Sequence, residues 1–192
     1  MKEVISLNVG EQGIRVGSQF WKMISREHGL NERGQLSCSS QDRLDKIGVF
    51  WEENMRGLEV TYRPRRIDVE DMENVTNTTE RIRKEVERCD NFQGFQFCQS
   101  IEETKGMLHQ VIKEEYPSKI VKSYLMTQGK SVENKLMLSD LKSNFDSIVL
   151  FDAKKMKEIY RTQNMNSDTD ACHLVARVMA DVTSLFRFPS QV

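Results

Sequence analysis

The chain has 192 residues, which is enough for one domain with a hydrophobic core and short for two. Hydrophobic residues make up 38% of it and charged residues 30%, a composition on the polar side of soluble globular proteins. The net charge of −1 provides no field for nucleic acid or an anionic membrane, and no apolar run is long enough to span a bilayer. Because the start of the chain also lacks a signal-peptide core, we expect an intracellular protein.

The cysteines and histidines do not indicate a metal site. The cysteines have no C-x-x-C spacing, so we interpret them as reduced, partly buried thiols: Cys38, Cys89, Cys98 and Cys172. The histidines are far apart in the sequence, and we expect each on a helix face or in the core: His28, His109 and His173.

The first segment combines a strand, a glycine turn and a helix start. Residues 1–9 are rich in β-forming residues, and apolar residues recur at helical spacing over 11–28, with Gly29 where a helix C-terminal glycine belongs. Gly10 and Gly13 permit a sharp turn between the two elements. Such glycines let a ligand approach the backbone, and the N–H groups of a helix start attract anions. The segment is a candidate phosphate site; tight-turn glycines without a ligand are the alternative interpretation.

The next part of the chain predicts a surface loop and a hairpin. Residues 31–44 are polar, and two short strands at 47–51 and 58–62 flank turn chemistry at 54–57. We then expect a loop over residues 71–80, in which Thr79 caps the following helix.

Beyond the hairpin, short strands alternate with helices. Strands are predicted at residues 66–69, 92–98, 120–126 and 147–151, and helices at residues 80–88, 152–160 and 170–186, with another helix ending at Tyr116. This order predicts an α/β fold with a mostly parallel sheet flanked by helices.

Several segments resemble, in the same order, the amino-terminal half of tubulin, and its β-type chain most closely. They are Met1-Lys2-Glu3-Val4-Ile5, Gly10-Glu11-Gln12-Gly13-Ile14-Arg15-Val16-Gly17, Tyr62-Arg63-Pro64-Arg65, Asp68-Val69-Glu70, Gln93-Gly94-Phe95-Gln96, Glu114-Glu115-Tyr116-Pro117 and Arg187-Phe188-Pro189-Ser190-Gln191. The resemblance covers the whole chain with internal gaps. It implies a single truncated tubulin/FtsZ-type nucleotide-binding domain over residues 1–192, which ends at the central helix and lacks the intermediate and carboxy-terminal domains.

The resemblance also implies GTP and Mg²⁺ as cofactors. The cofactor-binding residues that it implies are Gly10, Glu11, Gln12, Ser100, Thr104 and Gly106, and the residue associated with the metal is Glu70. No catalytic residue is implied. Glu11 stands where the family has glutamine, and an acid there repels phosphate unless a cation bridges it.

The chain departs from the family where the nucleotide should bind. Glu102 and Glu103 occupy the place of the glycine-rich loop G-G-G-T-G-S-G, where they either repel a triphosphate or simply begin the next helix. Ala153 and Cys172 replace two asparagines that contact guanine, and neither side chain offers the hydrogen bonds of an amide. The resemblance also implies that the family's partner-activating loop is missing. We therefore expect impaired GTP binding and an inactive GTPase.

Three functions remain open. The chain is a tubulin-like cytoskeletal protein of microtubules and the cytoplasm, a non-enzymatic module that binds tubulin subunits or tubulin-folding chaperones, or a degenerate product without function. No nucleic-acid or membrane partner is expected. The resemblance implies that the domain covering the central helix in the family is absent, so we also expect residues 170–186 to expose part of their apolar face.

Overall fold

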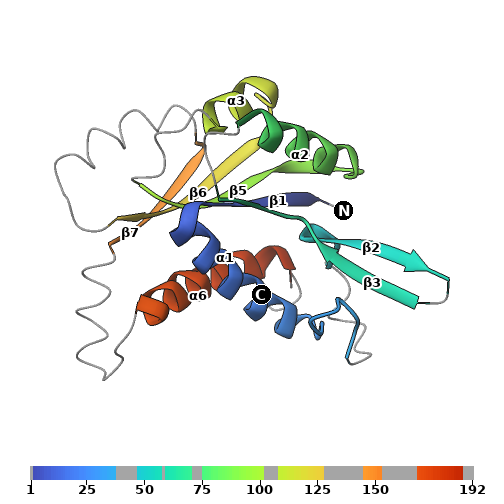
Figure 1. Cartoon of the computed structure of the whole chain (residues 1–192). Helices are drawn as coiled ribbons and strands as arrows, with labels where there is room; N and C mark the ends of the chain where they lie inside the picture. The colour runs from blue at the N-terminus through green and yellow to red at the C-terminus, as the bar shows by residue number, and fades with distance from the viewer. Residues whose placement is uncertain are drawn as a thin grey trace.

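The computed structural model of the chain describes residues 2–37, 47–57, 59–70, 75–101, 108–127, 145–152 and 168–187. Its strands are β1 (Glu3–Val9), β2 (Trp51–Arg56), β3 (Glu59–Pro64), β4 (Arg66–Val69), β5 (Phe92–Ser100), β6 (Ile120–Thr127) and β7 (Ser147–Asp152). Its helices are α1 (Gly10–Glu27), α2 (Val75–Glu87), α3 (Leu108–Glu115) and α6 (Asp168–Arg187), with a short 3₁₀ helix at Ile47–Val49. Figure 1 shows a layered α/β body from which the β2–β3 hairpin projects.

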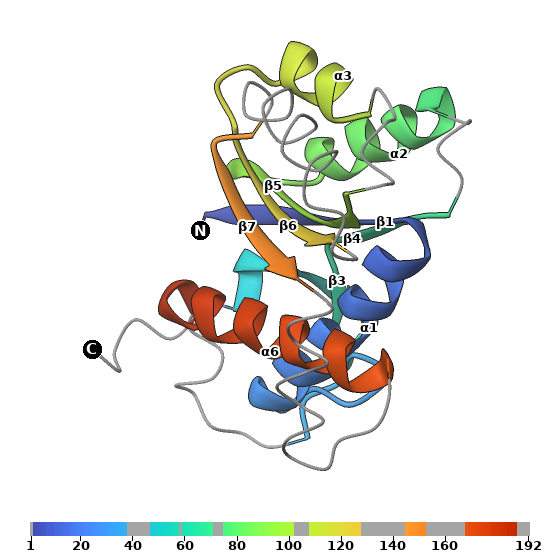
Figure 2. The ribbon, with the colours of Figure 1, turned by 90° about the vertical axis from the view of Figure 1, so that its left-hand side faces the viewer.

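The main sheet has five strands in the order β4-β1-β5-β6-β7, and all of its neighbouring strands are parallel. Helices α1 and α6 cover one face, and α2 and α3 cover the other (Figure 2). Strands β1 and β5 are buried almost throughout, as expected of parallel strands that are covered by helices on both faces of the sheet. The predicted α/β class, with a parallel sheet flanked by helices, is confirmed.

Alternate residues of the strands enter two separate cores. Ile5, Leu7 and Val9 of β1 join Ile82 of α2 and Ile112 of α3 on one side of the sheet. On the other side, the apolar stripe of α1 packs against α6, and this core includes Phe20, Trp21, Val175, Ala176 and Met179. The strand period of two thus divides the buried side chains between the helix layers.

The end of α1 has the geometry that its sequence predicts. Gly29 has a φ of 71°, a left-handed conformation that glycine adopts without a Cβ penalty. Its N–H bonds the carbonyl of Arg26 at 3.0 Å, and the N–H of Leu30 bonds that of Ser25 at 2.8 Å. This pair of bonds is the Schellman motif, which satisfies the last helical carbonyls.

The hairpin differs from the prediction in its bounds. Residues 47–49 form a 3₁₀ helix instead of a strand, and β2 begins only at Trp51. Arg56 pairs with Glu59, so the connection consists of two residues instead of the four predicted at 54–57. Gly57, with a φ of 65°, allows this tight turn. Residues 54–56, which were predicted as part of the turn from their composition, instead pair with residues of β3.

The predicted loop over residues 71–80 is wrong for its second half, because α2 begins at Val75. Thr79 lies inside the helix, and its hydroxyl donates to the carbonyl of Val75 at 2.9 Å. Inside a helix, a threonine hydroxyl can donate a hydrogen bond to the carbonyl four residues earlier, so threonine is not restricted to the N-cap position. Residues 153–160 of another predicted helix lie outside the described residues.

Within residues 171–184, helix α6 buries most of the apolar face that we expected residues 170–186 to expose in part, and the side chains of Leu185 and Phe186 lie outside the described residues. Within residues 171–184, the exposed positions are His173, Arg177 and Asp181, while Val175 and Met179 are buried against α1. The reason is the position of α6, which lies alongside α1 below the sheet (Figure 2). None of the helices in the described residues is long and apolar enough to cross a membrane.

The burial expected of the cysteines and histidines is confirmed for the described residues. Cys98 and Cys172 are buried and Cys89 is half-buried, all as thiols. His28 and His109 lie in the core, and His173 lies on a helix surface.

The thiol of Cys89 is expected to react slowly. Burial raises its pKa to about 11, against a smaller opposing effect of Arg65, so almost none of it is thiolate at neutral pH. With iodoacetamide at about pH 7.5, we expect alkylation of Cys89 to be at least about tenfold slower in the folded protein than in urea. Mass spectrometry of the Cys89 peptide measures both rates, and equal rates would contradict the burial of this thiol.

Candidate functional site

The candidate site lies where the connections of the sheet change sides. After β1 the chain turns to α1 on one face, and after β5 it leads toward α3 on the other. In open parallel sheets, ligands bind at the carboxyl ends of the strands that flank such a switch point. The register pairs Asn8 with Cys98 and Val9 with Val69, so Gly10, Ser100 and Glu70 come to the same edge of the sheet.

The start of α1 provides the backbone of this site. Gly10 has a φ of 68°, so it turns the chain directly from β1 into an 18-residue helix. Val9 stands at the N-cap and supplies no side-chain hydrogen bond. The N–H groups of the first turn and the positive end of the helix dipole therefore remain available for an anion.

The three glycines of the motif have different roles. A Cβ on Gly13 would lie 2.1 Å from the carbonyl oxygen of Cys98, and a Cβ on Gly17 would lie 2.3 Å from the side chain of Asn8. These two glycines let α1 pack closely on the sheet. Only Gly10 has the conformation of a turn glycine at the site, so the motif combines one candidate ligand contact with two packing contacts.

Glu11 is bridged by a cation. Its carboxylate lies 3.1 Å from the guanidinium of Arg15, one helical turn further on, and both side chains are more than half exposed. The acid that replaces the family's glutamine therefore extends along the outside of α1. Its repulsion of an anion at Gly10 is reduced by Arg15 and by solvent.

Gln12 and Cys172 lie together although they are 160 residues apart. The Sγ atom of Cys172 in α6 lies 3.9 Å from Oε1 of Gln12 in α1, and only 6% of Cys172 is exposed. A thiol is a weak donor and a weak acceptor. Cys172, at a position that the resemblance assigns to guanine contact, thus faces Gln12, which the resemblance assigns to the phosphates. The thiol of Cys172 nevertheless offers little hydrogen bonding to a base.

The other predicted site residues are placed only in part. Glu70 is exposed at the end of β4, and Ser100 is buried at the end of β5. The predicted residues Thr104 and Gly106, together with Glu102, Glu103 and Ala153, lie outside the described residues. No group of three or more metal-ligating side chains occurs in the described part of the chain. A lone carboxylate such as Glu70 suits Mg²⁺, which takes its other ligands from water and phosphates.

A polar network beneath the site was not predicted from the sequence. Asn8 donates from Nδ2 to Oδ1 of Asp68 at 2.7 Å, and Arg66 contacts both carboxylate oxygens of Asp68 at 2.8 and 2.6 Å. Arg66 also donates to Oγ of Ser18 at 3.0 Å. The network links β1, β4 and α1 directly below Val69 and Glu70. To predict this network, one would need to know that β1 pairs with β4, because this pairing places Asn8 opposite Asp68.

The fold and the site define a doubly wound α/β protein with a candidate phosphate-binding edge. No family model matches the chain. Among curated proteins, it is similar to the tubulin beta-3 chain of Echinococcus multilocularis, with 27% identity over 246 residues that cover 100% of this chain and 56% of that protein. The resemblance to β-tubulin is therefore confirmed, and the chain spans about half the length of this relative. The aligned span exceeds the 192 residues of the chain, which agrees with internal gaps.

Proposed function

We propose that the chain is a tubulin-like cytoskeletal protein that retains the phosphate end of a nucleotide site and binds Mg²⁺–GTP weakly. The observation that carries this proposal is Gly10, a glycine of left-handed conformation that begins a long helix without a side-chain cap at the switch point of the sheet. The likeness to a tubulin beta-3 chain supports guanine nucleotide as the ligand and a place in the cytoplasm with microtubules.

The residues present fit one end of this ligand better than the other. At the phosphate end, Gly10 has no Cβ to occupy the space of an oxygen, and Glu70 can hold a hydrated Mg²⁺. At the base end, Cys172 faces Gln12 with a thiol, which cannot pair with the edge of guanine as an amide can. Weak binding with little choice between purines follows from this division. Without a described group placed to activate water, we propose no hydrolysis.

A second candidate is a non-enzymatic module that binds tubulin subunits or tubulin-folding chaperones. The contact between Cys172 and Gln12 favours it, because a nearly buried thiol stands at the position that the resemblance assigns to base recognition. Co-sedimentation with microtubules, with and without Mg²⁺–GTP, separates the two candidates. If the chain is a nucleotide-binding tubulin-like protein, Mg²⁺–GTP should change the fraction of it that sediments with microtubules. If it is a non-enzymatic module, it should bind to the same extent with and without the nucleotide.

We expect Gly10→Ala to remove nucleotide binding while Gly29→Ala leaves it intact. These glycines have φ values of 68° and 71° at opposite ends of α1, so alanine costs each site a similar strain of about 1–2 kcal/mol. Only the first substitution also places a methyl group at the candidate phosphate site. Wild-type protein and Gly29→Ala should both gain thermal stability from Mg²⁺–GTP, each relative to its own nucleotide-free state, as for any ligand that binds the native state alone.

The control separates strain from ligand contact. If Gly10→Ala keeps the full thermal shift, the phosphates bind elsewhere. If wild-type protein gains no stability from Mg²⁺–GTP at millimolar concentration, the nucleotide proposal is wrong and the interaction module remains.

A further inference from the structure

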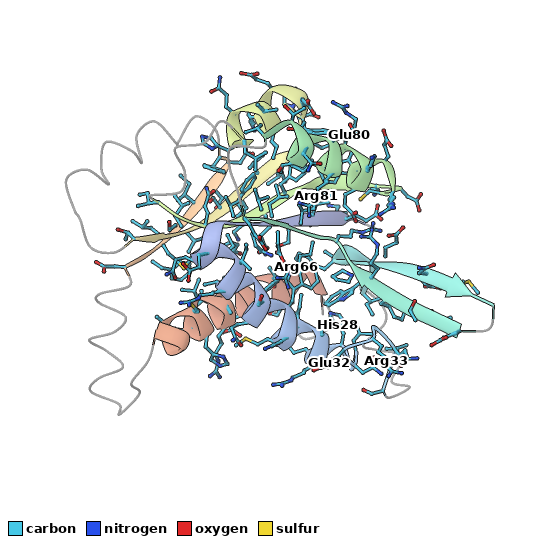
Figure 3. The ribbon with its side chains drawn as sticks, viewed as in Figure 1. His28, Glu32, Arg33, Arg66, Glu80 and Arg81 are labelled. Carbon is cyan, nitrogen blue, oxygen red and sulfur yellow. The ribbon has the colours of Figure 1, made fainter. Side chains whose placement is uncertain are left out.

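A second site candidate lies at the other end of α1, away from Gly10. A groove of about 1070 Å³ runs between the carboxyl half of this helix and the β2–β3 hairpin. Its aromatic base is formed by Trp21, Trp51 and Tyr62, which are all more than nine-tenths buried. Figure 3 shows Arg66 near the sheet and Glu32 and Arg33 in the loop after α1, and all three line the groove.

The hairpin wall of the groove is held in place by the body of the protein. The N–H of Tyr62 bonds the carbonyl of Gly34 at 2.8 Å, which ties β3 to the loop after α1. Arg63 of β3 bonds Glu52 of β2 at 2.8 Å through Nε and Glu85 of α2 at 2.6 Å through Nη2. The groove is therefore preformed, and a ligand need not order its walls.

The charged side chains of the groove differ in whether they already have partners. Two of the cations are neutralised inside the protein, because Arg63 contacts Glu52 and Glu85, and Arg66 contacts Asp68. The remaining cations are exposed and form no ion pair within the described part of the chain: Lys22, Arg26 and Arg33.

These cations are distributed along the groove. Lys22 and Arg26 are one helical turn apart on α1, on the same face as Ser18 and Ser25, and Arg33 follows in the loop. From Ser18 to Arg26 the helix rises about 12 Å at 1.5 Å per residue. An extended peptide that rises about 3.3 Å per residue covers this length with about four residues.

We propose that this groove binds an extended acidic segment of a partner protein. Carboxylates of that segment pair with Lys22, Arg26 and Arg33, while its backbone lies over the tryptophans. The indole N–H of Trp21 is a buried donor that has no acceptor among the described residues. A nucleic-acid strand fits less well, because Trp21, Trp51 and Tyr62 are more than nine-tenths buried and expose little ring surface on which bases could stack.

The protein carries its own reporter for this binding. Its two tryptophans, Trp21 and Trp51, both line the groove, with ring centroids 5.2 Å apart. The experiment titrates the full chain with a fluorescein-labelled hexaglutamate peptide and records fluorescence anisotropy, and an unlabelled copy of the peptide is followed by tryptophan emission. Hexaglutamine serves as the uncharged control. We expect hexaglutamate to bind, hexaglutamine not to bind, and affinity to fall as salt rises from about 50 to about 300 mM.

Charge reversal then locates the site. The double variant Lys22→Glu with Arg26→Glu should weaken binding of hexaglutamate by about tenfold or more, because two attractions become repulsions. The matched control is Lys84→Glu with Arg177→Glu, which changes the net charge equally on α2 and on the exposed face of α6 and should alter affinity by less than about twofold. Arg33→Gln, in the loop, provides a milder variant whose weaker binding supports the site even if the double variant unfolds.

Four results would overturn the proposal. The first is an equal loss of hexaglutamate affinity in the double variant and in its matched control, and the second is binding of hexaglutamine as tight as that of hexaglutamate. The third is tighter binding of an oligothymidylate than of hexaglutamate. The fourth is a dimer, seen by sedimentation, that dissociates in the double charge-reversal variant. The third result would identify a nucleic-acid groove, and the fourth would identify a second copy of the chain as the occupant.

Discussion

Replacing Gly13 with alanine is expected to destabilise the fold by about 3 kcal/mol or more, which is at the upper end of the cost of overpacking. The added Cβ would lie 2.1 Å from the carbonyl oxygen of Cys98 and 3.2 Å from the Cα atom of Gln99. Both are backbone atoms of β5, which is paired on its two sides with β1 and β6. The strand cannot move, so α1 must move away from it.

That displacement would disturb the core that α1 shares with α6. Phe20 and Ile24 of α1 are fully buried there, so a shift of the helix opens space at several contacts together. Urea unfolding followed by circular dichroism measures the loss of free energy. Gly57→Ala is the control, because a Cβ there meets nothing within 4 Å and the cost is only that of its φ of 65°, about 1–2 kcal/mol. A Gly13→Ala protein as stable as wild type would contradict the close packing of α1 on β5.

Removing the cation of the buried pair Glu3–Arg65 is expected to cost about 3–5 kcal/mol, because it leaves a buried carboxylate without a counter-charge. Both residues are at most 5% exposed, and their side chains are bonded to each other. Glu3 also accepts the N–H of Asn91 at 2.5 Å, so this carboxylate joins the starts of β1 and β5 to the loop before β4. Arg65→Met retains most of the side-chain volume and isolates the electrostatic effect.

A double-mutant cycle provides the test of this pair. Arg65 has two buried nitrogen atoms, Nε and Nη1, with no acceptor among the described residues, so its burial is only partly compensated. The double variant Glu3→Gln with Arg65→Met should therefore lose much less free energy of unfolding than the sum of the two single variants. As a control, Arg83→Met breaks pairs with Glu80 and Glu115 in which the side chains are about one-third to one-half exposed, and it should cost less than about 1 kcal/mol. Additive losses would show that Glu3 and Arg65 do not interact as described.

Helix α1 connects the two proposals on function. Its first turn, at Gly10, belongs to the candidate phosphate site, and its second half, from Ser18 to Arg26, forms one wall of the groove. The proposals are independent, because the charge-reversal variants leave Gly10 unchanged and Gly10→Ala leaves the groove unchanged. Loss of nucleotide binding together with retained peptide binding would support both.

Local features of the sequence determined the elements around the candidate site. The β-rich run before Gly10, the apolar period of α1 and the glycine after it predicted β1, α1 and the end of the helix at Gly29. These are interactions between residues a few positions apart, so the sequence contains both partners of each contact. The strands β4, β5, β6 and β7 were also predicted, from the residue pattern of short segments. The resemblance to β-tubulin likewise came from short segments in a shared order.

Only the tertiary structure decided which distant residues meet. The strand order places Gly10 beside Ser100 and Glu70, α6 brings Cys172 to Gln12, and the packing of α1 on β5 explains Gly13. Each of these contacts depends on strand register or helix placement, which hydrophobic burial sets across the whole chain rather than within a segment. For the same reason the Glu3–Arg65 pair and the groove beside α1 had no signature in the sequence, because their members come from separate segments.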